Sequence, residues 1–363
     1  MNDTMTAESA LPEDTIDPRA RDAAERLLAA VATLDDRTYW AARMFANVNL
    51  FLWHLDAFEA EGDPVPRFVE TFDAATGLLL APRGSEVCGA HFPAEAHDTT
   101  EAEERESMVA RMFSDVWVDM TDEVYFDESH RFVVERMAAN GIDAEDLFRG
   151  KTVLDAGCGS GKFSAAIARL GAKQVIGIDI GEKGIAFATE QAKKVDYGTR
   201  MSFRHGSVHD IPLPDGAVDM VWSNGVIHLT ADYDGCVEEF ARVIRPDGRL
   251  FLYVNGRFGL YELLFETLRR ASIGIPAPLF QHFLFSLGIN SGRVYWMMCA
   301  FYGPYQWRAK KEVEALLRAN GFADLRQLTR GIGIDQIELV SQGVPYARTK
   351  YGEAQLKYLA TRT

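Results

Sequence analysis

The sequence predicts an α/β fold built on a parallel β-sheet, and three consecutive features support this prediction. Residues 153–161 read Val-Leu-Asp-Ala-Gly-Cys-Gly-Ser-Gly, so a short β-forming run enters a glycine-rich turn. An amphipathic helix is predicted next, because four apolar residues follow at helical spacing, Phe163, Ala166, Ile167 and Leu170. Residues 174–180 then form a second apolar run of strand length. Strand, turn, helix and strand make one βαβ unit, whose two strands pair in parallel.

The glycine turn predicts a site for a nucleotide-like cofactor. Gly157, Gly159 and Gly161 carry no Cβ atom, so a ligand can lie directly against the main chain. The turn also opens a helix, whose first N–H groups face the ligand. A dinucleotide site would place two residues between its second and third glycines, whereas here Ser160 stands alone between them. A strand-to-helix turn without any ligand is the alternative.

The acid near the end of the second apolar run supports the ligand interpretation. Asp179 stands where a carboxylate would accept hydrogen bonds from the two hydroxyls of a ribose. A carboxylate left unpaired after an apolar strand would be costly. We therefore expect Asp179 to bind a ribose, with an N-cap role for the following helix as the alternative.

Four segments carry a resemblance to a known family. They are VLDAGCGSG from residue 153, VIGIDI from 175, HGSVHDIPLPDGAVDMVWSNGVIHL from 205, and the stretch 240–254, which contains Arg-Pro-Asp-Gly-Arg. In order and spacing they resemble the class I S-adenosylmethionine-dependent methyltransferases of type 11. The resemblance implies a Rossmann-like seven-stranded, mostly parallel sheet with helices on both faces. It also leaves room for a helical N-terminal extension and a helical insertion after the fifth strand.

The resemblance implies S-adenosyl-L-methionine as the cofactor. In the family the acid of the first strand, here Asp155, orients the turn and meets the methionyl amino group; capping of the turn is its alternative role. The adenine-binding loop of the family often carries an acid where this chain has Ser207, and here the acid is displaced to Asp210. The positions that the resemblance assigns to the cofactor are Asp155, Gly157, Cys158, Gly159, Gly161, Asp179, Ile180, Ser207, Val208 and Asn224.

The implied reaction is transfer of the methyl group to a small-molecule acceptor by in-line displacement, with release of S-adenosylhomocysteine. The sulfonium is a good leaving group, so the enzyme mainly aligns the reacting atoms. His228 is the candidate catalytic base, because an imidazole titrates near neutral pH, and a histidine that only packs against the pocket is the alternative. S-directed methylation of a thiol or thioether would need no base. Two further functions fit a cofactor site of this kind, a nicotinamide-dependent oxidoreductase and a non-catalytic cofactor-binding protein.

The rest of the chain divides into regions of different character. Residues 256–307 form an insertion rich in aromatic side chains, for which a lid over the acceptor, a homodimer interface and a plain hydrophobic core are the alternatives. We expect a disordered acidic tail over residues 1–18 and a helical region over 19–107. The methyltransferase core is then predicted over residues 108–255 and 308–363. The candidate substrate residues are Tyr125, Tyr302, Tyr305 and Arg308.

Composition and targeting signals favour a cytoplasmic enzyme. Lys and Arg total 38 against 53 Asp and Glu, and the net charge of −15 disfavours a nucleic-acid partner, which would need a basic surface. The four cysteines are scattered without metal-ligand spacing, so we expect no metal and a reducing compartment. The first residues lack the pattern of a signal peptide, and no apolar run is long enough to span a membrane.

Overall fold

The computed structural model describes residues 16–34, 37–81, 120–332 and 335–363. The chain divides into two compact units. The helical unit takes its described residues from Met1–Thr100, Arg257–Gly303 and Gly343–Glu353. The sheet unit takes them from Glu101–Gly256, Pro304–Gln342 and Ala354–Thr363. Most of the predicted tail, residues 1–15, and part of the predicted N-terminal region, residues 82–119, lie outside the described residues.

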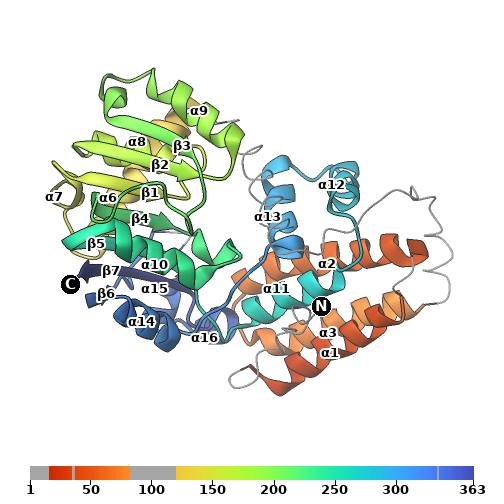
Figure 1. The fold of residues 1–363 in the computed structure, drawn as a ribbon. Coiled ribbons are helices and arrows are strands. Elements are labelled where there is room, and N and C mark those ends of the chain that lie inside the picture. The colour runs from red at the N-terminus through yellow and green to blue at the C-terminus, as the bar shows by residue number, and fades with distance from the viewer. Residues whose placement is uncertain (1–15, 35–36, 82–119, 333–334) are drawn as a thin grey trace, which may run out of the picture. The chain divides into compact units, whose positions relative to one another are not determined.

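The sheet unit is built on seven strands in the order β3-β2-β1-β4-β5-β7-β6 (Figure 1). The strands are β1 (Thr152–Ala156), β2 (Gln174–Asp179), β3 (Met201–His205), β4 (Val218–Asn224), β5 (Ile244–Asn255), β6 (Phe322–Gln327) and β7 (Gln355–Arg362). Strands β1 to β5 pair in parallel, whereas β7 pairs antiparallel with both β5 and β6. The predicted seven-stranded, mostly parallel sheet is therefore confirmed.

The strand order creates one preferred place for a ligand. The chain runs outward from β1 to β2 and β3, and then returns to place β4 on the other side of β1. Connections therefore leave β1 and β4 in opposite directions, and a crevice opens outside their carboxyl ends. The glycine turn follows β1 directly, and Asn224 ends β4. The topology thus brings the predicted cofactor residues to this switch point.

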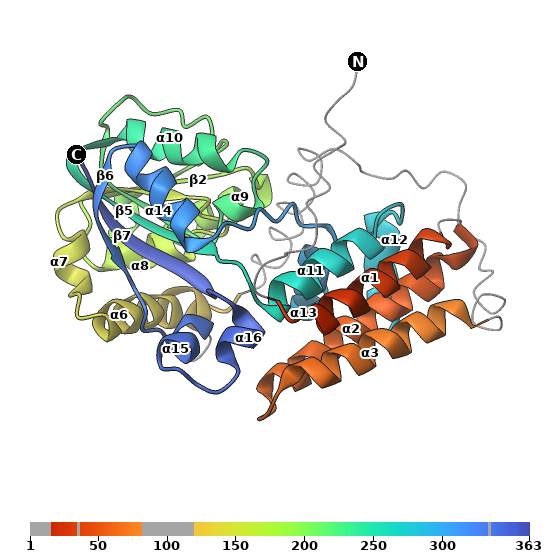
Figure 2. The same cartoon turned by 90° about the horizontal axis from the view of Figure 1, so that it is seen from below.

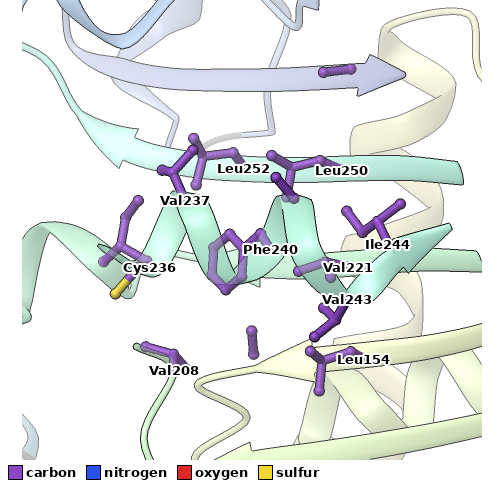
Figure 3. Packing of buried hydrophobic residues seen from close by; sticks show 14 of the residues in the cluster. Leu154, Val208, Val221, Cys236, Val237, Phe240, Val243, Ile244, Leu250 and Leu252 are labelled. Carbon is purple, nitrogen blue, oxygen red and sulfur yellow. The ribbon is translucent and has the colours of Figure 1, made fainter. Parts of the chain in front are cut away.

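Helices cover both faces of the sheet (Figure 2). One face packs against α6 (Ser129–Ala139), α7 (Ala144–Phe148) and α8 (Lys162–Arg169), and the other against α10 (Tyr233–Val243) and α14 (Lys310–Ala319). Alternate residues of β1 point to the two faces. Val153 packs in the hydrophobic cluster with α6, α7 and α8, and Leu154 packs in the cluster with α10 and α14. Figure 3 shows Phe240 of α10 among Leu154 and the residues of β4 and β5.

The remaining elements of the sheet unit are short or lie at its edges. They are the π-helical turn η2 (Glu123–Glu128), α9 (Glu182–Ala192), the 3-10 turns η3 (Asp196–Arg200) and η4 (Ile227–Leu229), and α15 (Gln336–Ser341). Helix α9 contacts β2 and β3, and η2 contacts α6 and α8. The turn η2 leads straight into α6, and its residues 123–128 lie beside α8.

The helical unit contains α1 (Pro18–Ala32), η1 (Arg37–Tyr39), α2 (Trp40–Glu59), α3 (Pro64–Leu80), α11 (Leu260–Ala271), α12 (Ala277–Ser286), α13 (Ser291–Tyr302) and α16 (Ala347–Tyr351). Helix α11 contacts α1, α2, α13 and α16. None of the described helices has the length and apolar character that a membrane crossing requires.

Aromatic side chains of the predicted insertion, residues 256–307, form the core of the helical unit. The ring of Phe51 lies 6.2 Å from that of Phe265 and 6.0 Å from that of Phe301. Phe280 stacks on Phe301 at 4.6 Å. Packing within this unit therefore accounts for much of the aromatic content, as the plain-core alternative expected.

Two boundaries differ from those predicted. Residues 16–18 were expected in the tail, but Ile16 is buried and Asp17 caps α1 by accepting the N–H of Arg19 at 2.9 Å. Residues 343–353 were expected in the core but cluster with the helical unit. Lys350 explains this placement, because its Nζ donates to the carbonyls of Phe58 at 2.9 Å and Ala60 at 2.8 Å.

Candidate functional site

The glycine turn is tied to the end of β2 by main-chain hydrogen bonds. The N–H groups of Gly157 and Cys158 both donate to the carbonyl of Ile178, at 2.8 and 3.0 Å. Gly157, Gly159 and Gly161 have φ of +77°, +53° and +79°, a region that favours glycine. A Cβ atom on Gly157 would lie 2.4 Å from Val226 Cγ1, and one on Gly161 would lie 2.7 Å from the Cβ of Ala188. The turn is therefore held in one conformation that other residues could not adopt.

Asp155 lies beneath this turn as a buried acid. The residue is 2% exposed, and Ser164 on α8 donates its hydroxyl to Oδ2 at 2.6 Å. Burial, together with the nearby charge of Asp179, raises the pKa of the Asp155 carboxyl to about 7. The side chain thus reaches α8, the helix that follows the turn. A cation bound nearby would favour the ionised form.

Asp179 connects the turn to the helix that follows β2. Its Oδ2 accepts the N–H of Gly159 at 2.8 Å, and its Oδ1 accepts the N–H of Gly181, the N-cap residue of α9, at 2.7 Å. The pKa of this carboxyl is raised overall, because the effect of burial exceeds that of the two hydrogen bonds, which lower the pKa. A carboxylate oxygen can accept more than one hydrogen bond, because it has two lone pairs. The main-chain bonds therefore leave acceptor capacity for a ribose, and the expected ribose contact stays a prediction.

The neighbouring loops contain the other predicted cofactor residues. Ile180 follows β2 and receives a hydrogen bond from His205 Nε2 at its carbonyl, at 3.2 Å. Ser207 Oγ pairs with His209 Nδ1 at 3.0 Å. Val208 is buried in the same cluster as residues of β1 and β2. Packing thus fixes the main chain of this loop beside the ends of both strands.

Tyr125 has a structural role that the sequence did not reveal. We expected it among the substrate residues, but its side chain is fully buried on η2 and its hydroxyl donates to the carbonyl of Ser160 at 2.9 Å. Burial raises the pKa of the phenol, so the hydroxyl remains a donor. The residue therefore braces the glycine turn from the side of η2.

His228 lies on η4, directly after β4, and is 4% exposed. Burial lowers the pKa of its imidazole to about 3, so the ring is neutral at physiological pH. Its Nδ1 is buried and has no hydrogen-bond partner among the described residues. The ring lies 5.9 Å from that of Tyr305 and 6.2 Å from that of Tyr253. His228 is thus packed between aromatic rings, and a base of such low pKa would accept a proton only weakly.

The other predicted substrate residues are divided between the two units. Tyr302 is buried in the helical unit, where its hydroxyl donates to the carbonyl of Ile275 at 2.7 Å. Tyr305 lies in the sheet unit, stacked on Trp307 at 5.2 Å. Arg308 forms an ion pair with Asp234 at 2.9 Å, also in the sheet unit. The internal hydrogen bond of Tyr302 gives it a packing role, and the expected substrate contact stays a prediction.

A cavity of about 410 Å³ opens in the sheet unit beside the end of β4. The residues that line it come from η2, α6, the start of α8, the ends of β4 and β5, and the segment before β7. They are Val124, Glu128, Ser129, Phe132, Arg136, Lys162, Phe163, Asn224, Tyr253, Asp335 and Gln355. Only Asn224 among them was predicted from the sequence.

A buried ionic cluster borders this cavity. Arg136 on α6 binds Asp335 through two hydrogen bonds, Nε to Oδ2 at 3.0 Å and Nη2 to Oδ1 at 2.8 Å. Its Nη1 donates to Asn224 Oδ1 at 3.1 Å. Lys357 on β7 also binds Asp335 Oδ1, at 2.7 Å. The cluster therefore connects Asn224, a predicted cofactor residue, with α6, the start of α15 and β7. No sequence motif predicted these contacts.

Comparison with known proteins agrees with this arrangement. Residues 154–252 match the family described as a methyltransferase domain. The 27-O-demethylrifamycin SV methyltransferase of Amycolatopsis mediterranei (strain S699) is 30% identical over 175 residues, which cover 46% of this chain and 64% of that protein. The arsenite methyltransferase of Aquipseudomonas alcaligenes is 35% identical over 131 residues, which cover 34% of this chain and 38% of that protein. The chain thus covers less than two thirds of the length of either relative.

A solved S-adenosylmethionine-dependent methyltransferase from Thermotoga maritima is also similar. It has a TM-score of 0.43 and 17% identity, and the match covers 70% of this chain and 99% of that chain.

Proposed function

Because the chain carries a class I S-adenosylmethionine-dependent methyltransferase domain, we propose that it transfers the methyl group of S-adenosylmethionine to a small-molecule acceptor. The observation that carries the proposal is the glycine turn at the switch point, with two acids beside it. Asp155 and Asp179 are both buried enough for their pKa values to be raised. A ligand that carries an ammonium and a sulfonium would offset the cost of ionising them.

The residues of the turn fit this cofactor in charge and in shape. Asp179 holds the N–H of Gly159 and keeps acceptor capacity for the ribose hydroxyls. Asp155 lies close enough to Asp179 for the charge of Asp179 to raise its pKa, and would meet the methionyl amino group. The bound cofactor would supply an activated methyl group on sulfur. The protein would then fix the acceptor in line with that methyl group and exclude water.

The environment of His228 favours an acceptor that needs no strong base. A pKa of about 3 leaves the imidazole neutral but makes it a poor proton acceptor. A thiolate, a thioether or a carboxylate reacts without losing a proton in the displacement step. We therefore propose that His228 shapes the pocket, and that an acceptor atom without a proton to remove is methylated.

The acceptor is proposed to be small, and the working compartment to be the cytoplasm. The two relatives are named for a demethylrifamycin and for arsenite, both small acceptors. The net charge of −15 would repel a nucleic acid. Three of the four cysteines are described as free and buried thiols, which suits a reducing compartment.

The experiment that tests the cofactor assignment is isothermal titration calorimetry with S-adenosylhomocysteine and, separately, with NADH. We expect S-adenosylhomocysteine to bind with a stoichiometry of one per chain and NADH not to bind. Binding of NADH in preference to S-adenosylhomocysteine would overturn the proposal in favour of the oxidoreductase alternative. Absence of binding by either ligand would also contradict it.

A further inference from the structure

The cavity beside β4 has aromatic walls. The rings of Phe132 and Phe163 lie 5.7 Å apart, and Tyr253 of β5 completes the lining on the sheet side. Its volume of about 410 Å³ falls within the range of small-molecule sites. Flat apolar walls of this kind favour a planar ligand, whose faces can pack against the rings.

The ionic cluster at this cavity contains more positive than negative charge. Arg136 and Lys357 share the single carboxylate of Asp335, and the three side chains are only 2%, 0% and 4% exposed. Two buried cations against one buried anion leave an excess charge of +1 among these described residues. Burial and the charge of Arg136 together lower the pKa of Lys357 to about 8, against the pairing with Asp335, which raises it. Such an excess is costly away from water unless an anion joins the cluster.

The rim of the cavity does not supply that anion. Glu128 lines the cavity, but Lys162 lines it too, and the charge of Glu128 acts on Lys162 by raising its pKa against burial. One rim cation and one rim anion cancel. The excess in the buried cluster therefore stays at +1.

Arg136 retains hydrogen-bonding capacity toward a ligand. A guanidinium has five N–H donors, and three of those of Arg136 are used by Asp335 and Asn224 within the described residues. The same residue lines the cavity and has its guanidinium 3.9 Å from the ring centroid of Phe132. A charged donor is thus placed next to an aromatic wall.

We propose that this cavity binds the methyl acceptor, and that the acceptor is a planar molecule that carries a carboxylate. The carboxylate lies at Arg136 and neutralises the cluster, while the planar part packs against the wall that Phe132, Phe163 and Tyr253 form. Asn224, the predicted cofactor residue at the end of β4, lines the same cavity and bonds to Arg136. The proposal rests on the proposed function, since it names the class of acceptor for that activity.

Fluorine NMR titrations with a matched pair of probes test the proposal. The probes are 6-fluoro-2-naphthoate and 6-fluoro-2-naphthamide, which share one ring system and differ in the charged group. The full chain is first saturated with S-adenosylhomocysteine, so that the methionyl carboxylate is already in place. We expect the naphthoate to bind at least about tenfold more tightly than the amide, because only the acid neutralises the cluster.

The substitution Lys357→Met separates charge from shape. Lys357 does not line the cavity, and its loss leaves Asp335 paired with Arg136 in a neutral cluster. We expect the preference for the acid to fall to less than about threefold in this variant. Lys311→Met, at an exposed residue of α14, makes the same change in net charge and is expected to keep the preference.

Three outcomes of the probe titrations would overturn the inference. They are equal binding of the two probes by the wild-type protein, no binding of either probe, and an acid preference that survives in Lys357→Met. The wild-type comparison needs no variant, so it decides the matter even where Lys357→Met does not fold.

Measurements of S-adenosylhomocysteine binding distinguish two carboxylates that could neutralise the cluster, that of the acceptor and the methionyl carboxylate of the cofactor. Displacement of S-adenosylhomocysteine by the naphthoate, or a tenfold loss of its affinity in Lys357→Met, would assign the cluster to the methionyl carboxylate and overturn the inference. Failure of the proposed function is visible separately, as absence of S-adenosylhomocysteine binding by the wild-type protein. Titration of the free protein with the two probes then still reports whether the cavity prefers an anion.

Discussion

Replacement of Asp155 by asparagine is expected to stabilise the protein at alkaline pH. Asp155 is 2% exposed, and burial raises the pKa of its carboxyl from 3.8 to about 7. At 1.36 kcal/mol per pKa unit, this difference corresponds to about 4 kcal/mol as an upper bound on the cost of ionising it in the folded state. Asparagine has nearly the same shape, and its amide oxygen can still accept the hydroxyl of Ser164.

The pH dependence follows from the direction of the pKa change. Between about pH 4 and pH 7 the folded protein holds a proton on Asp155 that the unfolded chain has already released. The free energy of unfolding therefore falls as pH rises through this window, and stays low above it. The asparagine variant has no such proton, so its advantage over the wild-type protein should grow from pH 5 to pH 8.

Urea denaturation of both proteins at pH 5 and pH 8, without ligand, measures this effect. We expect the variant to gain about 1 to 2.5 kcal/mol relative to the wild-type protein between the two pH values, because only the part of the window above pH 5 contributes. Asp219→Asn is the matched control: burial opposes ionisation of Asp219, but the N–H of Thr152 and the ion pair with Arg245 lower its pKa overall. That control should lose the same amount of stability at pH 5 and at pH 8, because the Asp219 carboxyl is ionised at both pH values in the folded and in the unfolded chain. A gain for Asp155→Asn that is the same at both pH values would refute the reasoning.

Three further predictions concern the same site. Asp179→Ala should weaken binding of S-adenosylhomocysteine by more than about 1.5 kcal/mol in calorimetry, because charge-assisted hydrogen bonds are lost. The control Asp22→Ala, on the exposed side of α1, should leave the affinity unchanged. Equal affinities of Asp179→Ala and the wild-type protein would remove Asp179 from the ribose site. Tyr125→Phe leaves the carbonyl of Ser160 without its 2.9 Å hydrogen bond and should lower the free energy of unfolding by about 1 kcal/mol in urea, a loss that an unchanged denaturation midpoint would rule out. The imidazole carbon resonances of His228 should not shift between pH 5 and pH 8, since its pKa is about 3; a midpoint near pH 6.5 would show that the ring is not buried.

The part of the fold that could be predicted depends on local patterns. The hydrophobic pattern of a strand or helix is visible within a few residues of sequence. This was so for the run 153–161, for the apolar stripe of α8 and for the run 174–180, and the structure has β1, α8 and β2 in those places. The two acids could be named because each stands at or near the end of an apolar strand.

The missing parts of the site depend on contacts between distant residues. Arg136 and Asp335 are 199 residues apart in the chain, and neither stands in a motif. Their pairing needs the position of α6 relative to the start of α15, which no local period encodes. Tyr125 lies in a π-helical turn, whose spacing differs from the 3.6-residue pattern used to predict helices. A buried arginine has no signature in sequence, because arginine usually marks the surface.

The interpretation of aromatic residues in the insertion shows a different limit. Phe265, Phe280 and Phe301 read equally well as a lid, an interface or a core, since all three need apolar rings. Contacts such as that between Phe51 and Phe301 explain those three rings by packing within the helical unit. Tyr302 likewise has an internal partner in Ile275. Composition alone therefore could not distinguish a functional surface from ordinary packing.

A crystal structure of the protein with S-adenosylhomocysteine is the decisive test of the cofactor site. We expect the adenosyl group along residues 157–161, with both ribose hydroxyls on the Asp179 carboxylate and the amino group near Asp155. Density for the ligand elsewhere, with the crevice at the glycine turn filled by the protein's own side chains, would contradict this assignment.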